Sequence, residues 1–391
     1  MINSEDIKSA SRLLAACSED EINALLTDIA DELERRIPEV LEANAKDQAR
    51  MDRSNPMFDR LVLNEERLRD IAADTRKVAT LPSPLGRTLE ERTLPNGLEI
   101  RRVSVPFGVI GVIYEARPNV TVDVASLCLK AGSACILKGG SDADDSCQAL
   151  VRVIHAALTR HGLPSEAVTL LPATREATAE LLAARGLVDV LIPRGSSRLI
   201  NYVRENASVP VIETGAGVVH CYVDREADID MAARIVENAK CRRVSVCNAL
   251  DCLLVDKSLE PQLDRILAPM QGRVTFHREE ASWGTEWLSY DLAIRLVDGV
   301  DEAMDHIRRF GSGHSESIVT QNQATAEKFL RGVDAACVYW NAPTSFTDGA
   351  QFGLGAEIGI STQKLHARGP MALEAITTYK WTIKGNGQTR I

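Results

Sequence analysis

Short apolar runs alternate with amphipathic stretches along residues 106–212, and this alternation restricts the fold more than any other feature of the chain. Each run is nearly continuous, as is typical of a strand buried on both faces of a parallel sheet. The intervening stretches carry apolar residues at helical spacing. The sequence therefore predicts an α/β fold with a doubly wound parallel sheet. The predicted strands are 109–114, 134–138, 167–171, 188–192 and 209–212, and the predicted helices are 120–130, 142–160, 174–185 and 197–206.

The flanking regions have different patterns. Residues 1–80 have leucines and isoleucines at helical spacing, and further strand–helix units are predicted at 292–310 and 316–340. An Asn96-Gly97 pair between strand-like residues predicts a β-hairpin within 87–105. Residues 376–383 read as a strand. Because two strands alone are marginally stable in water, we expect the hairpin to pair with another segment, and this C-terminal strand is the candidate partner.

Composition narrows the classes of function. The 391 residues are enough for two or three domains. The chain starts without a recognisable signal peptide and has no apolar run long enough to span a membrane, so we expect a cytoplasmic protein. A net charge of −10 argues against a nucleic-acid surface. The nine cysteines form no zinc-binding pattern, and Cys241, Cys247 and Cys252 have the wrong spacing, so we predict no metal site.

One of these cysteines, Cys247, stands between a predicted helix at 227–240 and a predicted strand at 249–255. A side chain in such a loop can face a cleft rather than a core. Arg242 and Arg243 lie just upstream, and positive charge favours the thiolate, which is the reactive form. Cys247 is therefore a candidate nucleophile. A buried structural cysteine is the alternative.

Two predicted strands end in glycine- and serine-containing segments that open helices, Lys138-Gly139-Gly140-Ser141 and Arg194-Gly195-Ser196-Ser197. In open α/β sheets, ligands bind at the carboxyl ends of the strands, and backbone N–H groups at a helix start suit a phosphate. The same residue types are also ordinary helix caps. Two such segments at the edge of one sheet favour a binding site for a dinucleotide.

Three further sites carry polar side chains that could act in chemistry. Asn119, after the first predicted strand, is a candidate donor to an oxyanion, or a turn residue. Glu213, after residues 209–212, is a candidate base or a loop cap. Lys364, His366 and Arg368 form a cationic cluster in an acidic chain, which suits an anionic substrate or a solvated loop.

Four segments carry a resemblance to a known family: residues 106–119, 211–215, 245–249 and the long segment 355–370. They resemble the gamma-glutamyl phosphate reductases, also called glutamate-5-semialdehyde dehydrogenases, in the aldehyde dehydrogenase superfamily. The resemblance extends over nearly the whole chain from about residue 5. It implies an NADP-binding domain at 1–86 and 106–217, a catalytic domain at 218–371, and a small β arm for oligomerisation at 87–105 and 372–391.

The resemblance also implies roles for residues. It makes Cys247 the nucleophile and Asn119 an oxyanion donor, facing one another across a cleft between two domains. It places Lys138 at the cofactor and Glu286 at the nicotinamide ribose. Gly139, Ser141, Arg194, Gly195 and Ser196 are further cofactor candidates because they lie at the two helix starts. Arg117 and the 364–368 cluster are the candidates for substrate binding. Glu213 matches the superfamily's general base, which activates water in enzymes that oxidise aldehydes.

The implied activity is the NADPH-dependent reduction of L-glutamyl 5-phosphate to L-glutamate 5-semialdehyde with release of phosphate, through a cysteine thioester, in proline biosynthesis. We expect a small-molecule substrate, a homo-oligomer and functional coupling to a glutamate 5-kinase, with no nucleic-acid or membrane partner. Two alternatives stay open: an aldehyde dehydrogenase that hydrolyses its thioester, and a non-catalytic nucleotide-binding or scaffold protein.

Overall fold

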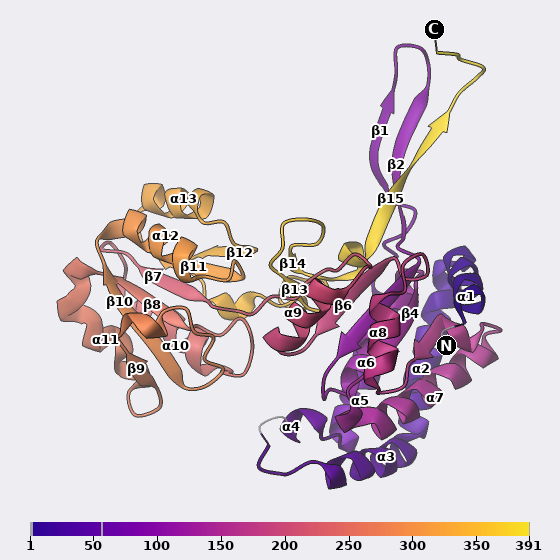
Figure 1. Cartoon of the computed structure of the whole chain (residues 1–391). Coiled ribbons are helices and arrows are strands. Elements are labelled where there is room, and N and C mark those ends of the chain that lie inside the picture. The colour runs from indigo at the N-terminus through magenta and orange to yellow at the C-terminus, as the bar shows by residue number, and fades with distance from the viewer. Residues whose placement is uncertain (1–2, 56–57, 391) are drawn as a thin grey trace. The chain divides into compact units, whose positions relative to one another are not determined.

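The computed structural model describes residues 3–55 and 58–390, and the chain divides into two compact units, each with its own parallel sheet (Figure 1). Unit 1 comprises Met1–Glu213, Leu354–Gly359 and Met371–Ile391. Unit 2 comprises Thr214–Gly353 and Ile360–Pro370.

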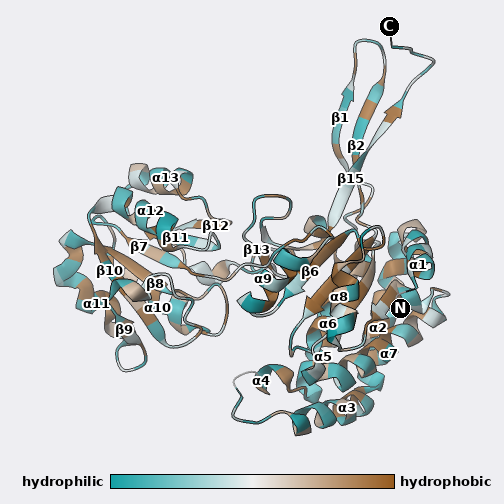
Figure 2. Ribbon diagram, viewed as in Figure 1, coloured by the Kyte–Doolittle hydropathy of each residue, from teal (hydrophilic) through white to brown (hydrophobic). Residues whose placement is uncertain are grey.

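The sheet of unit 1 has the strand order β5-β4-β3-β6, and all of its pairings are parallel. Every residue of β3 and β4 is buried, as their nearly continuous apolar sequences require (Figure 2). A helix follows each strand, so the predicted doubly wound arrangement is confirmed. The strands are β3 (Val109–Tyr114), β4 (Ala134–Lys138), β5 (Val168–Leu170) and β6 (Val190–Arg194), and the helices are α6 (Asn119–Lys130), α7 (Asp144–Arg160), α8 (Arg175–Leu182) and α9 (Ser197–Asn206).

The predicted strand at 209–212 is wrong. Val211 makes only an isolated bridge to Leu191. The Leu191 N–H donates to the Pro210 carbonyl at 2.8 Å, and the Ile212 N–H donates to the Leu191 carbonyl at 2.9 Å. Because Pro210 has no N–H, it cannot donate in a ladder, and the pairing stops there.

Helices of the N-terminal region pack beside this sheet, and one of them supports a later helix start. Asp47 is fully buried and accepts hydrogen bonds from the Ser146 N–H at 2.8 Å and the Asp145 N–H at 3.3 Å. Helix α7 has no side-chain cap of its own, so Asp47 caps it from α3. The N-terminal helices are α1 (Ser4–Ala16), α2 (Glu19–Arg35), α3 (Ile37–Arg50), α4 (Phe58–Leu61) and α5 (Glu65–Thr80).

An antiparallel sheet of order β1-β2-β15 completes unit 1 (Figure 1). Strand β1 (Thr88–Thr93) pairs with β2 (Glu99–Pro106), and β2 pairs with β15 (Thr377–Lys384). The predicted Asn96-Gly97 hairpin and its predicted C-terminal partner are thus both confirmed. Tyr379, Trp381 and Ile383 are all exposed on β15.

The sheet of unit 2 has the parallel order β12-β11-β7-β8-β10-β9. Apolar residues of β7 and β8 contribute to two core clusters. The strands are β7 (His220–Val223), β8 (Cys252–Asp256), β9 (Thr275–His277), β10 (Asp291–Val297), β11 (Ser315–Val319) and β12 (Cys337–Trp340), and the helices are α10 (Ile229–Cys241), α11 (Leu263–Leu267), α12 (Gly299–Phe310) and α13 (Gln323–Gly332). Short β13 (Ile360–Ser361) pairs with β14 (Gly369–Pro370). Single 3₁₀ turns lie at Ser141–Ala143, Ser165–Ala167, Lys257–Gln262, Ala268–Met270, Glu280–Ser282, Thr344–Phe346 and Leu373–Ile376.

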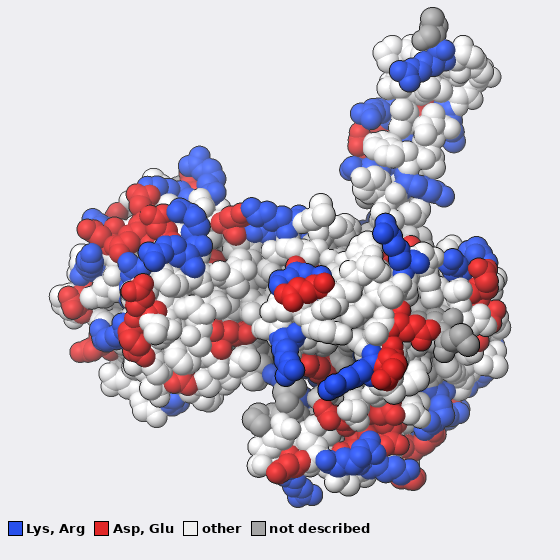
Figure 3. All heavy atoms as spheres, viewed as in Figure 1, with Lys and Arg blue, Asp and Glu red and all other residues white. Residues whose placement is uncertain are grey.

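The surface carries charges of both signs, interspersed on the face shown in Figure 3. Many of them form ion pairs, including Arg76 with Glu34 and Arg160 with Asp28. Among residues 3–55 and 58–390, no helix is both long and apolar enough to cross a membrane.

Candidate active site

Cys247 lies in the segment between helix α10 and strand β8, as the sequence predicts. Its side chain is half-buried, whereas Arg242 and Arg243 are exposed. The Leu250 N–H donates to the carbonyl of Ala239 at 3.0 Å, which ties the segment to the end of α10. The thiol is therefore held on a short, anchored loop.

Gly217 packs directly against the backbone of Cys247. A Cβ atom at position 217 would lie 1.7 Å from the Cys247 carbonyl oxygen, so only glycine fits there without movement. The Gly217 N–H donates to Glu286 Oε1 at 3.0 Å, which holds this segment in place. The sequence indicated Glu286 as a cofactor residue but did not indicate a role for Gly217. A close approach between two backbone segments far apart in the chain produces no recognisable sequence pattern.

Asn248, the residue after the nucleophile candidate, is also a positioning residue that the sequence analysis missed. It is 6% exposed, and its Nδ2 donates to the carbonyls of Thr347 at 2.9 Å and Ser345 at 3.4 Å. Its own carbonyl accepts from Thr344 Oγ1 at 2.9 Å. These bonds tie the Cys247 loop to residues 344–347. The one feature of the sequence that could have indicated this role is the position of Asn248 next to Cys247.

The cationic cluster lies on the loop between β13 and β14. Both Lys364 and Arg368 are exposed, and both bind the carboxylate of Asp334, whose pKa these hydrogen bonds lower. His366 is exposed and has left-handed backbone geometry, with φ of 45°. In this structure the cluster binds a carboxylate of the chain itself, which is the chemistry predicted for an anionic substrate.

Lys138 and Ser141 lie at the carboxyl end of β4 in unit 1. Lys138 Nζ donates to the Gly139 carbonyl at 2.8 Å, and burial lowers the pKa of the lysine. Ser141 opens into a pocket of about 540 Å³, a size that suits a nucleoside. The pocket is lined by Arg50, Ser141, Asp144, Asp145, Gln148, Leu170, Leu171, Pro172, Ala173 and Thr174. The lining combines apolar side chains with charged and polar ones.

The second predicted phosphate segment, Arg194 to Ser196, already holds an anion. Ser196 is the N-cap of α9, and its N–H donates to Glu115 Oε2 at 2.8 Å. Ser196 Oγ donates to Glu115 Oε1 at 3.1 Å. A Cβ at Gly195 would lie 2.5 Å from the same carboxylate. A carboxylate of the chain thus takes the position in which a phosphate was expected.

Asn119 is the first residue of α6, directly after β3. Its Nδ2 donates to Asp123 Oδ2 at 2.9 Å, and burial raises the pKa of Asp123 to about 7. A carboxamide has two N–H donors, so this bond also fixes the direction of the second. Arg117, just before it, is half-buried and follows Ala116, which has φ of 25°.

Glu213 is the last residue of the first segment of unit 1. It is half-buried, and its Oε2 lies 3.2 Å from Arg204 Nη1.

These two α/β units with a cysteine loop are those of the aldehyde dehydrogenase class. The model of the aldehyde dehydrogenase family matches residues 5–281. The chain is 56% identical to a gamma-glutamyl phosphate reductase of Bacteroides thetaiotaomicron, with 98% of this chain and 97% of the relative covered. It is 53% identical to one of Chlorobium luteolum, with 99% and 97% covered. The crystal structure of gamma-glutamyl phosphate reductase from Thermotoga maritima superposes with a TM-score of 0.96 at 40% identity and covers 99% of both chains. The chain belongs to the gamma-glutamyl phosphate reductase family, a branch of the aldehyde dehydrogenases.

Proposed function

We propose that this protein reduces L-glutamyl 5-phosphate to L-glutamate 5-semialdehyde with NADPH and releases phosphate, as a step of proline biosynthesis. The observation that carries the proposal is the half-buried thiol of Cys247, on a loop that Gly217 and Asn248 fix from two sides. The relatives are gamma-glutamyl phosphate reductases, and their name indicates the substrate.

In the proposed mechanism the Cys247 thiolate attacks the acyl carbon, the C–O bond to phosphate breaks, and phosphate leaves with its electron pair. The product of this step is a thioester, which accepts hydride more readily than a carboxylate does. Bound NADPH would supply that hydride. The resulting tetrahedral thiohemiacetal then returns the thiolate to Cys247 and releases the aldehyde.

Each tetrahedral stage carries an oxyanion that needs preorganised donors. We assign this role to the Asn119 side chain and to the backbone N–H of Cys247. Lys138, Gly139 and Ser141 are the proposed cofactor ligands in unit 1. Arg194, Gly195 and Ser196 are also proposed, on the condition that the Glu115 carboxylate leaves the Ser196 N–H when the cofactor binds. Glu286 is proposed for the ribose, in addition to its bond to Gly217.

The role of Glu213 differs between the proposed reductase and the alternative, an aldehyde dehydrogenase that hydrolyses its thioester. An aldehyde dehydrogenase that hydrolyses its thioester needs a base to activate water, whereas a reductase that exchanges phosphate does not. The Arg204–Glu213 pair at 3.2 Å is compatible with either role. The oxidative reaction with glutamate semialdehyde distinguishes the two enzymes: it requires phosphate in the proposed reductase and only water in the alternative.

The direct test replaces the nucleophile. Cys247→Ala should abolish turnover while NADPH still binds, as measured by steady-state assay and by cofactor fluorescence. Cys241→Ala, at the end of α10, is the matched control because that cysteine is also half-buried and forms no disulfide. Normal turnover in Cys247→Ala, or loss of turnover in both variants, would contradict the mechanism.

Substrate and cofactor binding have separate tests. Arg117, Lys364, His366 and Arg368 are proposed to bind the amino-acid end of the substrate, so Lys364→Gln and Arg368→Gln should raise KM for the acyl phosphate and leave KM for NADPH unchanged. The preference for NADPH over NADH is assigned to Lys138 and Ser141, and equal use of both cofactors would contradict that assignment.

The proposal also includes assembly. The exposed aromatic and aliphatic side chains of β15 suit pairing of the β arm with a second copy of the chain, and a homo-oligomer is therefore expected. A kinase that forms the acyl phosphate must supply the substrate, and coupling to a glutamate 5-kinase follows from this need.

A further inference from the structure

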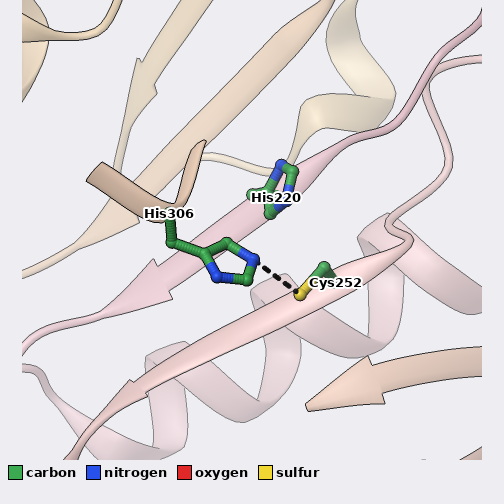
Figure 4. A group of neighbouring side chains, drawn as sticks. All are labelled: His220, Cys252 and His306. Carbon is green, nitrogen blue, oxygen red and sulfur yellow. Dashed lines mark hydrogen bonds between the residues drawn. The ribbon is translucent and has the colours of Figure 1, made fainter. Parts of the chain in front are cut away.

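Unit 2 contains a buried group of three side chains of the types that bind metal ions. His220 of β7, Cys252 of β8 and His306 of α12 point toward one another (Figure 4). Their exposed fractions are 0%, 0% and 1%. One ring nitrogen of each histidine and the thiol sulfur all lie within 4.8 Å of one another. No step of the proposed reaction uses these residues.

The distances suit a small thiophilic cation. A tetrahedral zinc ion with a Zn–N bond of about 2.05 Å and a Zn–S bond of about 2.3 Å sets nitrogen and sulfur roughly 3.6 Å apart. Cys252 Sγ lies 3.6 Å from His306 Nε2. Ligands of one thiolate and two imidazoles are among those that zinc prefers.

A second observation points to a ligand. His220 Nε2 is buried and has no hydrogen-bond partner among the described residues. The other ring nitrogen, Nδ1, lies 3.1 Å from Glu316 Oε2, and Glu316 is itself fully buried. A carboxylate behind a histidine is the usual outer contact of a metal-binding imidazole, because it fixes the ring with its free nitrogen directed at the metal.

The contact of Arg295 with His306 opposes metal binding at this group and must change if a metal binds. Arg295 Nη1 lies 2.7 Å from His306 Nδ1, and a guanidinium can only donate, so Nδ1 carries the lone pair and Nε2 carries the proton. Binding of the metal to Nε2 therefore requires the His306 proton to move to Nδ1, which breaks the bond from Arg295, and it requires Cys252 to lose its thiol proton to solvent. Arg295 is also paired with Glu302 at 2.6 Å, so the guanidinium keeps a carboxylate partner when the bond to His306 is broken.

We propose that His220, Cys252 and His306 form a zinc site that joins β7, β8 and α12 within unit 2. The ion adds a cross-link between two adjacent strands and the helix that covers them, and so it stabilises unit 2 rather than taking part in hydride transfer.

The test uses the full-length protein. After incubation with Zn²⁺ and desalting, elemental analysis should find about one zinc per chain, and Co²⁺ in its place should give thiolate-to-metal absorption in the near ultraviolet. Zinc should raise Tm by about 5 °C or more when it is well above its Kd. Cys252→Ala should lose the metal, the absorption and the Tm shift.

Two matched variants exclude other thiols. Cys221→Ala changes a fully buried cysteine on the neighbouring strand β7, and Cys247→Ala removes the proposed nucleophile. Both should keep the zinc and the cobalt spectrum. Wild-type protein that binds no zinc and no cobalt, or a cobalt spectrum that persists in Cys252→Ala, would overturn the proposal. A spectrum that disappears in Cys247→Ala would overturn it as well, because the metal would then lie at the nucleophile.

Discussion

The two units fix their candidate residues by different means. In unit 1, side chain binds side chain at the start of a helix, as Asn119 binds Asp123 in α6 and Ser196, the N-cap of α9, binds Glu115. In unit 2, Cys247 is held through main chain, by the close packing of Gly217 and by carbonyls that Asn248 binds. Replacing one member of a side-chain pair removes a single hydrogen bond, whereas disrupting a backbone contact displaces the whole loop. Substitutions in unit 2 should therefore have the larger effects on turnover.

The largest effect is expected from Gly217→Ala. The new methyl group would meet the Cys247 carbonyl at 1.7 Å, so the loop must shift. A displacement of about 1 Å in a reacting group costs on the order of 100-fold in rate, and kcat should fall by at least that factor with KM for NADPH little changed. Steady-state kinetics measures this.

Gly284→Ala is the control in the same unit. A Cβ there has ordinary contacts of 3.7 Å with Phe310 Cδ1 and 3.8 Å with the Phe310 carbonyl oxygen, so turnover should be preserved. If Gly217→Ala retained wild-type kcat, the backbone contact would not position the thiol, and the contrast between the units would fail.

A smaller effect is expected from Asn248→Asp. A carboxylate has the same shape but cannot donate to the carbonyls of Thr347 and Ser345. The loss of these buried bonds should cost about 2–3 kcal/mol of stability and reduce kcat roughly 10-fold. Asn238→Asp is the control, since Asn238 uses its oxygen to accept from Ser345 Oγ at 2.7 Å, and aspartate keeps that oxygen. Equal unfolding midpoints for the two variants would show that the amide donor is unimportant.

The sequence predicted the unit 1 sheet well because its signal is local. A buried strand such as β3 consists of consecutive apolar residues, which can be recognised in the sequence. The hairpin is determined by the two turn residues Asn96 and Gly97. The error at 209–212 has a physical reason: Val, Pro, Val and Ile are apolar enough for a strand, but Pro210 cannot donate. Apolar side chains predict that a segment is buried, but pairing in a β-sheet also requires backbone N–H donors.

The candidate site was less predictable because several contacts join distant residues. Cys247 could be placed between a helix and a strand, but Gly217 lies thirty positions earlier in the chain. The His220–Cys252–His306 group was missed for the same reason: its members come from β7, β8 and α12, and metal-binding patterns in sequence require short spacings. Only the parallel pairing of β7 with β8 brings the first two together.

In unit 1, Asp47→Ala should have a local effect on stability. The change removes the acceptor for the N–H groups of Asp145 and Ser146, and so leaves the start of α7 without its cap. Loss of such a cap costs about 1–2 kcal/mol. Hydrogen exchange at these two amides should speed up roughly 5- to 30-fold, whereas Asp142→Ala, an exposed neighbour, should leave it unchanged. Unchanged exchange in Asp47→Ala would show that α7 does not depend on α3.

The smallest effect, and the one that tests the side-chain pairs of unit 1, concerns the pH dependence of Asp123. Its pKa is raised by burial from 3.8 to about 7, so the folded protein holds a proton that the unfolded chain has already lost. This contribution to the free energy of unfolding is present below pH 4 and is lost as the pH rises toward 7. Asp123→Asn keeps an oxygen to accept from Asn119 and does not titrate. Relative to wild type, the variant should gain on the order of 1–2 kcal/mol between pH 5 and pH 8, measured by denaturant unfolding.

The exposed Asp70 provides the control for that experiment, because Asp70→Asn should leave the pH profile of unfolding parallel to wild type. A parallel profile for Asp123→Asn would mean that Asp123 is ionised at both pH values. Asn119 would then donate to a full negative charge, a stronger bond than the one to a neutral carboxyl group. In that case Asn119, the proposed oxyanion donor of unit 1, would be held as firmly as the Cys247 thiol of unit 2. The two units would then differ in the kind of contact but not in its strength.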